Sequence, residues 1–271
     1  MKTNKVYYGD AMELSKELQP NSINLVITSP PYANTKSYGE GINIFFPAIY
    51  AEWFLPLAKQ VERALTPDGS FILNIGDICE KGTRSIYVYD LVCRIVRETK
   101  LKLHDRYFWI KKNGLPSSGP QRLDNKTEMI FHFKKNHQIK CFMDEIREPH
   151  APSSLARWET PCGSTPVVDK EGNQFVKKRK HKANPKGKIP DGNFGFSNAA
   201  SQRKDRVAKH PAAFHPDVPH KFINWLTEEG DVVLDPFMGS GTTKKVCEKL
   251  NRKWIGFELN KNYKDLIDET I

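Results

Sequence analysis

A glycine-rich turn follows an apolar run, residues 231–235, that ends in an acid. The turn reads Asp235-Pro236-Phe237-Met238-Gly239-Ser240-Gly241-Thr242-Thr243, and a helical pattern begins directly after it. Such a turn aims backbone amides at a ligand and lets it approach closely, because glycine has no side chain in the way. The spacing is neither the G-x-G-x-x-G dinucleotide pattern nor a P-loop with its Lys-Ser/Thr pair. The turn indicates a ligand site without identifying the ligand.

An acid ends the next predicted strand, at Glu258. It lies 23 positions after Asp235 (258 − 235). In nucleotide-binding sheets an acid at roughly this distance accepts hydrogen bonds from ribose hydroxyls. Taken alone, Glu258 would be no more than a surface acid, and its interest comes from the turn that precedes it.

A second cluster, Thr28-Ser29-Pro30-Pro31-Tyr32, follows another apolar run. The two prolines fix a rigid turn whose carbonyls are not used in a strand ladder, and the turn presents an aromatic ring. This arrangement suits a flat ring that carries an amino group. Tyr32 can stack on such a ring, while Ser29 and the Pro30 carbonyl accept its amino hydrogens. A plain strand-ending turn is the alternative interpretation.

Strand and helix patterns alternate along the chain and predict the elements that position the two clusters. Apolar runs predict strands at 5–9, 23–28, 70–75, 106–111, 128–134, 231–235 and 253–258, and helical spacing predicts helices at 48–65, 86–99, 219–228 and 243–250. This alternation is typical of a doubly wound, mostly parallel α/β sheet built from both ends of the chain. The alternating run at 128–134 predicts an antiparallel edge strand.

The positive charge of the chain is concentrated in one segment. The 271 residues include 42 Lys/Arg and 32 Asp/Glu, a net charge of +10. Residues 115–210 hold 19 Lys/Arg and 10 Asp/Glu, so they carry +9 of this excess (19 − 10). Within them, residues 149 to about 205 lose all periodicity, which predicts a loop-rich insert. A basic segment beside a nearly neutral one favours a polyanionic partner, although a solvated basic surface would have the same charge.

Composition excludes several other classes of protein. No apolar run approaches the roughly 18 residues of a membrane helix, and the first residues, MKTNKVYYGD, have no secretory signal pattern. The five cysteines form no C-x-x-C pair, so neither a zinc site nor a disulfide framework is indicated. We expect a soluble, cytoplasmic protein without a metal.

The two clusters, in this order, resemble the beta group of S-adenosylmethionine-dependent DNA amino-methyltransferases. In this circularly permuted group a TSPPY-type catalytic motif comes first, a target-recognition region follows, and the cofactor loop comes last. Here Thr28 precedes Asp235 by 207 positions (235 − 28). Supporting matches are Gly9-Asp10-Ala11, Thr66-Pro67-Asp68-Gly69-Ser70, Trp109-Ile110-Lys111, Glu128-Met129-Ile130-Phe131 and His210-Pro211-Ala212-Ala213-Phe214.

The resemblance implies a Rossmann-like fold with a seven-stranded sheet and four segments. Residues 1–114 would form the catalytic half and 209–271 the cofactor-binding half. Residues 115–148 would supply the edge strand and the entry to the recognition region, and 149–208 the recognition insert. The partner would be double-stranded DNA, and a companion restriction endonuclease is possible, as in restriction-modification systems.

The resemblance also assigns roles to individual residues. Ser29, Pro30, Pro31 and Tyr32 would be catalytic. The residues implied to bind S-adenosylmethionine are Asp10, Ala11, Thr28, His210, Pro211, Phe214, Asp235, Pro236, Phe237, Gly239, Ser240, Gly241, Thr242 and Glu258. Those implied to contact DNA are Arg122, Lys177, Lys178, Arg179 and Lys180. The loop from Asp235 to Thr242 would hold the methionine end, Glu258 the ribose, and Asp10 with Phe237 the adenine.

The implied reaction moves a methyl group to the exocyclic amine of a base flipped out of the duplex. In the family, Ser at the position of Ser29 is typical of enzymes that methylate the 4-amino group of cytosine, and Asp of most adenine enzymes. An N6-adenine methyltransferase therefore stays open as an alternative. An RNA or free-base methyltransferase and a non-catalytic DNA-binding protein are the remaining alternatives.

The run Lys177-Lys178-Arg179-Lys180 predicts a measurable salt effect. Each phosphate contact contributes roughly 0.9 to the slope of log affinity against log salt concentration. Replacing the four cations by Ala should flatten that slope by about 2–4 and weaken binding equally on cognate and random DNA. A titration of DNA affinity against salt measures this. An unchanged slope would identify the run as a solubilising segment, and a lost site preference with an unchanged slope would mean that these side chains contact base edges.

Overall fold

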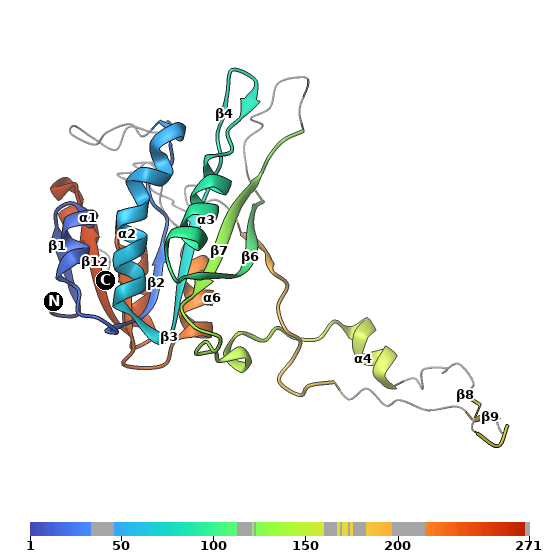
Figure 1. Ribbon diagram of the computed structural model, residues 1–271. Coiled ribbons are helices and arrows are strands. Elements are labelled where there is room, and N and C mark those ends of the chain that lie inside the picture. The colour runs from blue at the N-terminus through green and yellow to red at the C-terminus, as the bar shows by residue number, and fades with distance from the viewer. Residues whose placement is uncertain are drawn as a thin grey trace. The chain divides into compact units, whose positions relative to one another are not determined.

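The computed structural model describes residues 1–33, 46–112, 121, 123–159, 167–168, 170–172, 174–175, 183–196 and 215–268 (Figure 1). The chain divides into two compact units. The first combines Met1–Phe142 with Gly192–Ile271, and the second is Met143–Asp191. Both ends of the chain therefore build one unit.

The described part of the first unit contains a sheet of eight strands. Their order is β1 (Lys5–Tyr8), β12 (Lys253–Glu258), β11 (Val232–Asp235), β2 (Ile23–Thr28), β3 (Leu65–Ile75), β7 (Thr127–Lys134), β6 (Lys102–Lys111) and β10 (Asn193–Phe196). All neighbours pair in parallel except β7, which is antiparallel to both β3 and β6. The predicted mostly parallel α/β sheet is confirmed, with eight strands in place of seven.

The additional strand, β10, comes from within the segment 149–208, for which the sequence showed no periodicity. Its sequence, Asn-Phe-Gly-Phe, has an alternating pattern, but Asn and Gly are poor strand formers and conceal it. Phe194 is buried, and β10 pairs with β6 along Phe108–Lys111. Tertiary packing thus stabilises a strand that has little propensity of its own.

The antiparallel strand β7 is not an edge strand, contrary to the expectation from its alternating sequence. It lies between β3 and β6, and residues Glu128–Phe133 are all buried. His132 occupies a position expected to face solvent, but its Nε2 atom lies 2.9 Å from Ser70 Oγ inside the sheet. A buried polar side chain, whose Nδ1 atom has no hydrogen-bond partner among the described residues, therefore made a fully buried strand resemble a half-exposed one.

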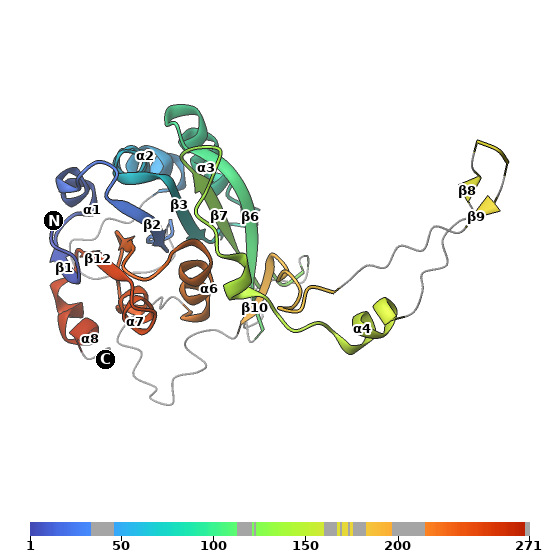
Figure 2. The same cartoon turned by 90° about the horizontal axis from the view of Figure 1, so that it is seen from below.

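Helices cover both faces of the sheet (Figure 2). On one face lie α1 (Ala11–Leu14), α2 (Tyr50–Ala64) and α3 (Tyr87–Glu98), and on the other lie α6 (Asp217–Leu226) and α7 (Thr242–Lys249). Short helical segments complete the unit: η1 (Ser15–Glu17), η2 (Pro47–Ile49), η4 (Lys261–Tyr263) and α8 (Lys264–Asp268). The arrangement is the doubly wound one that the sequence predicts.

The connection from α2 to β3 differs from the predicted turn at 66–69. The helix ends at Ala64 and the strand begins at the next residue. In the ladder with β2, Ile23 pairs with Leu65 but Leu25 pairs with Ser70. Residues 66–69 are therefore accommodated as an irregularity at the start of the strand.

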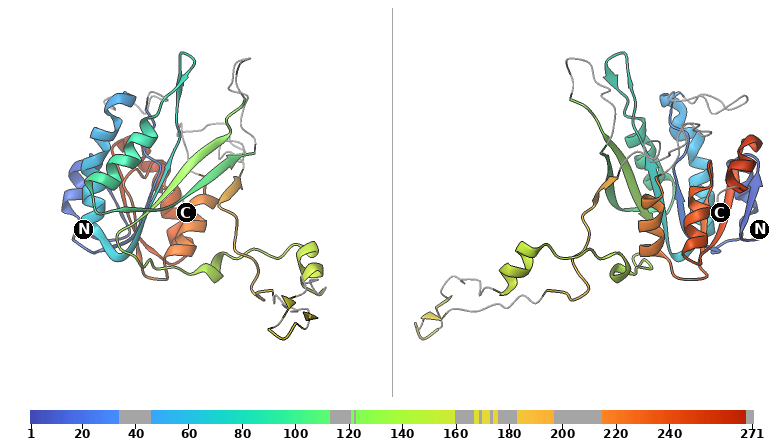
Figure 3. Two further views of the ribbon diagram at one scale, coloured as in Figure 1. Left: turned by 45° about the vertical axis from the view of Figure 1, so that its right-hand side comes forward. Right: turned by 180° about the vertical axis from the view of Figure 1, so that it is seen from behind.

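The carboxyl ends of the parallel strands meet at one edge of the sheet. The strands β12, β11, β2 and β3 are neighbours there, although they come from opposite ends of the chain. A small hairpin of β4 (Cys79–Glu80) and β5 (Thr83–Arg84) extends beyond the end of β3 (Figure 3). Ligands of open α/β sheets bind outside this edge.

The described residues of the second unit contain little regular structure. It contains η3 (Met143–Ile146), α4 (Pro152–Glu159), and a short hairpin of β8 (Val167–Val168) and β9 (Gln174–Phe175). An isolated bridge joins Glu148 to Lys188. Along the described ranges, no helix is long and apolar enough to cross a membrane.

The side chain of Phe54 is a central element of the core. It is fully buried on α2, its ring stacks on Phe71 of β3, and it also contacts Phe237. Phe54→Ala should lower the free energy of unfolding by about 3–5 kcal/mol, because the truncation leaves a cavity.

A urea titration measures this loss, with Tyr89→Ala on α3 as the matched control. Tyr89 is 51% exposed, so its removal should change stability by no more than about 0.5 kcal/mol. Equal losses in the two variants would show that Phe54 is not a core residue.

Candidate active site

One buried hydrogen bond joins the two sequence clusters. Thr28 Oγ1 donates to Asp235 Oδ1 at 2.8 Å, across 207 residues of sequence. Thr28 ends β2, Asp235 ends the neighbouring β11, and both side chains are buried. The bond brings the Ser-Pro-Pro-Tyr turn and the glycine-rich turn to adjacent positions at the edge of the sheet.

The carboxylate of Asp235 is fully engaged by the protein. Its Oδ1 also accepts from the Phe237 backbone amide at 3.1 Å, and its Oδ2 accepts from Thr243 Oγ1 at 2.5 Å. Burial raises the pKa of Asp235, and the hydrogen bonds from Thr243 and Thr28 oppose that shift. Through the Phe237 amide and Thr243, Asp235 therefore fixes the conformation of the glycine-rich turn.

Glu258 holds the other side of the same turn. Its Oε2 accepts from the Gly239 amide at 2.7 Å, and its Oε1 accepts from the Asn260 amide at 2.8 Å. Burial raises the pKa of Glu258. The turn and the end of β12 form one connected structure, and Glu258 is part of it rather than a separate surface acid.

The two glycines of the turn are required by backbone conformation. Gly239 has φ +55° and Gly241 has φ +80°, which favour residues without a side chain. A Cβ atom on Gly241 would lie 3.4 Å from Ile267 of α8. The sequence pattern explains these glycines by the close approach of a ligand. At Gly241 the structure shows a different reason, since the φ angle itself favours glycine. Gly241 is the N-cap residue of α7, whose first-turn amides have no acceptor within the helix.

Asp10 and Phe237 flank the turn. Asp10 is exposed and caps α1 by accepting from the Met12 amide at 2.8 Å. The amide of Gly9 donates to the Glu258 carbonyl at 2.9 Å, which places the end of β1 beside β12. Phe237 is partly exposed, and its ring centroid lies 5.8 Å from that of Trp53. Trp53 of α2 is partly buried, packs against the core and borders the candidate site.

A polar network surrounds Tyr32. Its hydroxyl donates to Glu128 Oε2 at 2.7 Å and accepts from Asn74 Nδ2 at 2.9 Å. Asn74 Nδ2 also donates to the same Glu128 oxygen at 2.7 Å, and Lys111 forms an ion pair with Glu128. Ser29 Oγ lies 3.2 Å from the Tyr32 hydroxyl. Burial, followed by the charge of Glu128, raises the pKa of Tyr32 well above its ordinary value, so the hydroxyl keeps its proton.

Two further residues fix the Tyr32 turn. Tyr50 of α2 donates to the Pro31 carbonyl at 2.6 Å. Gly76, directly after β3, allows close approach of the Tyr32 ring, because a Cβ atom there would lie only 2.9 Å from Tyr32 Cε2. Among the described residues, none donates to the Pro30 carbonyl. The Pro30 carbonyl and Ser29 Oγ are therefore neighbouring acceptors at the end of β2.

The other residues assigned from the resemblance lie in different places. Ala11 is buried in α1, Pro236 follows Asp235 in the turn, and Ser240 Oγ lies 3.3 Å from Thr242 Oγ1. The residues that fall outside the described part of the chain are Arg122, Lys177, Lys178, Arg179, Lys180, His210, Pro211 and Phe214.

Sequence reasoning did not single out Asn74 or Glu128, nor the pairing of Glu128 with Lys111. A signal was present: Asn74 interrupts the apolar run Phe71–Ile75, and Glu128 precedes the apolar run of β7. A buried polar residue in such a position needs a partner, and here the partners are the catalytic-motif residues.

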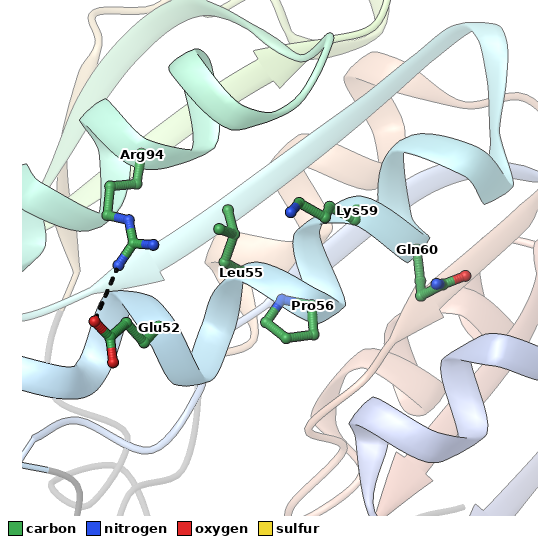
Figure 4. A pocket seen from close by; sticks show the side chains of 6 residues that line it. All are labelled: Glu52, Leu55, Pro56, Lys59, Gln60 and Arg94. Atoms are coloured by element: carbon green, nitrogen blue, oxygen red, sulfur yellow. Dashed lines mark ion pairs between the residues drawn. The ribbon is translucent and has the colours of Figure 1, made fainter.

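A pocket of about 310 Å³ lies elsewhere, on α2 and α3 (Figure 4). It is lined by Glu52, Leu55, Pro56, Lys59, Gln60 and Arg94. Arg94 Nη1 and Glu52 Oε1 are 3.9 Å apart across it. It is lined by none of the residues assigned above.

Comparison with known proteins shows which family the chain is similar to. A DNA methylase family model matches residues 23–269. The type II methyltransferase M.PvuII of Proteus hauseri is 33% identical over 95% of this chain and 80% of its own length. The solved structure of a cytosine-N4-specific PvuII DNA methyltransferase has a TM-score of 0.73 and 28% identity, and the match covers all of this chain and 87% of that one.

A putative DNA modification methylase from Thermus thermophilus, solved in complex with S-adenosyl-L-methionine, shares the fold. Its TM-score is 0.63 at 20% identity, and the match covers 98% of this chain and 91% of that one. The sheet edge that joins Thr28 to Asp235 is thus found in a chain that matches the family model over nearly its whole length. The chain belongs to the DNA methylase family.

Proposed function

We propose that the protein transfers a methyl group from S-adenosylmethionine to the 4-amino group of a cytosine flipped out of double-stranded DNA. The observation that carries the proposal is the buried Thr28–Asp235 hydrogen bond of 2.8 Å. It fixes a turn with two acceptors for an amino group beside a turn with the features of a cofactor site. The cytosine-N4 specificity of the similar PvuII methyltransferase supports the choice of base.

The glycine-rich turn has the features that the cofactor requires. The amino terminus of α7 provides backbone amides for a carboxylate. The amides of Gly239 and Gly241 are used within the turn, by Glu258 Oε2 and the Met238 carbonyl, and hold it in shape. Phe237 offers a partly exposed ring for the adenine, and Asp10 and Glu258 offer carboxylates for adenine and ribose donors. When bound, S-adenosylmethionine supplies an electrophilic methyl group on its sulfonium.

The Ser-Pro-Pro-Tyr turn acts on the amine. The lone pair of an exocyclic amine is delocalised into the base, so the amine is a poor nucleophile. Ser29 Oγ and the Pro30 carbonyl accept hydrogen bonds from its two N–H groups, which shifts the nitrogen towards tetrahedral geometry and makes the lone pair available. One of these two protons leaves to solvent once the nitrogen–carbon bond has formed. Tyr32 stacks on the extruded base. Flipping costs a few kcal/mol, which binding to the duplex must offset.

The basic recognition segment, residues 149–208, supports a duplex partner. Phosphate contacts determine affinity and register, whereas base-edge contacts determine the site. We further propose that the enzyme acts in the cytoplasm and has a companion restriction endonuclease, as the description of M.PvuII as a type II methyltransferase suggests.

Analysis of modified nucleosides tests the proposed function. Duplex DNA of mixed sequence is incubated with the protein and S-adenosylmethionine, digested to nucleosides and examined by mass spectrometry, with a reaction lacking the cofactor as control. The expected product is N4-methyldeoxycytidine. N6-methyldeoxyadenosine would overturn the choice of base, and cofactor binding without any methylated nucleoside would indicate a non-catalytic DNA-binding protein.

Substitution of Tyr32 separates the base from the cofactor. Tyr32→Ala should lower the rate of methyl transfer by up to about 100-fold while the affinity for S-adenosylmethionine, measured by calorimetry, stays unchanged, because stacking on a base is worth about 1–3 kcal/mol. Tyr32→Phe should retain much more of the activity, because it keeps the ring. Loss of cofactor affinity in the Ala variant would place Tyr32 on the cofactor instead.

A further inference from the structure

We propose that Glu128 is a positioning residue that orients the hydroxyl of Ser29 through Tyr32, so that Ser29 presents an acceptor to the amine. The inference rests on the proposed function, since it deepens the role given to Ser29. It assigns a role to a carboxylate that the sequence indicated only as part of a strand.

The topology explains how Glu128 reaches the site. Strand β7 is antiparallel to β3 and β6, so its beginning lies at the edge where their carboxyl ends lie. Glu128 is the second residue of β7 and pairs with Trp109 of β6. Asn74 and Lys111 lie near the ends of β3 and β6. A parallel strand in this place would bring its last residues, not its first, to the site.

Counting protons gives the direction of each hydrogen bond. The Glu128 carboxylate, paired with Lys111, only accepts. The single proton of the Tyr32 hydroxyl therefore goes to Glu128 Oε2, at 2.7 Å. Asn74 must present its amide nitrogen, because its oxygen at 2.7 Å from the same carboxylate would be repelled. In this orientation Asn74 Oδ1 is buried without a partner among the described residues, a cost that the donated bonds offset.

The direction at Ser29 follows from these bonds. Ser29 Oγ and the Tyr32 oxygen are 3.2 Å apart, and either could donate on distance alone. Because the Tyr32 proton is committed to Glu128, Ser29 must be the donor. The lone pairs of Ser29 then remain available, shared only with a longer contact of 3.3 Å from Asn74 Nδ2.

This orientation matters for the reaction. A Ser29 hydroxyl pointing at the amine would compete with the amino hydrogens and donate to the nitrogen lone pair, which must attack the methyl group. When the Ser29 hydroxyl donates to Tyr32, only the lone pairs of Ser29 Oγ face the amine. The Glu128 carboxylate therefore selects the productive orientation before the base arrives, which is electrostatic preorganisation.

A double-mutant cycle with Glu128→Gln and Tyr32→Phe tests the inference. Glutamine at position 128 has nearly the same shape, but its amide can donate to Tyr32 and reverse the direction of the hydrogen bonds from Ser29 to Tyr32 to Glu128. Phenylalanine at position 32 keeps the ring and removes the hydroxyl that joins Ser29 to Glu128. Each single variant should lower kcat about tenfold, with the KM for DNA and the affinity for cofactor unchanged. If Glu128 acts through Tyr32, the double variant should be no slower than either single one. Independent effects would multiply to about a hundredfold loss, and that result would overturn the inference.

Asp231→Asn is the matched control. Asp231 is similarly enclosed, with a side chain 11% exposed and an ion pair to Lys140 at 2.7 Å, but it lies before β11, at the opposite edge. It should lower stability without changing kcat. If Glu128→Gln does not fold, Glu128→Asp serves in the cycle, because it keeps the charge beside Lys111 and withdraws the oxygen from Tyr32.

The double-mutant cycle and the nucleoside analysis test different claims, so either claim can be overturned without the other. The cycle measures the rate of methyl transfer to whichever base is modified. A product of N6-methyladenine would therefore overturn the proposed base, and the cycle would still test the role of Glu128. Methylated cytosine with multiplicative losses overturns the role of Glu128 alone. A protein that transfers no methyl group overturns both.

Discussion

The hydrogen bond between Thr28 and Asp235 is the constraint on which the site depends. The ladder between β2 and β11 has only two registered pairs, Leu25 with Val233 and Val26 with Leu234. Beyond them the strand ends are joined by side chains, in a buried environment where an unpaired carboxylate would be costly. Because Asp235 also binds Phe237 and Thr243, a single carboxylate sets the distance between the two turns and the shape of one of them.

The antiparallel strand β7 adds what the parallel strands cannot supply. Parallel strands bring only their carboxyl ends to the edge, which here gives the two turns and Asn74. By running the other way, β7 delivers a charged residue from its amino end, and β6 delivers the balancing Lys111. The Glu128 carboxylate can therefore accept a hydrogen bond from Tyr32 although Glu128 belongs to neither turn. Gly76 and Tyr50 hold the Tyr32 turn from the remaining sides.

Much of this could be predicted from the sequence, because the decisive signals are local. The strands at 23–28 and 253–258 have the predicted bounds, and the two turns are recognisable from proline and glycine alone. What could not be predicted depends on which strands become neighbours. The central position of β7, the strand β10 and the network of Glu128 with Asn74 follow from sheet order, which no local pattern encodes. The requirement for glycine at position 241 likewise comes from its φ angle of +80°.

The central claim is that the two turns form one site in which the methyl donor meets the amine acceptors of the first turn. A crystal structure of the protein with S-adenosylmethionine tests it most directly, through the position of the sulfonium methyl group. The account predicts that the methionine end lies on the Gly239–Gly241 turn and that the methyl group is directed at the space beside Ser29 Oγ and the Pro30 carbonyl. A cofactor bound away from this turn, or a methyl group directed away from Ser29, would contradict it.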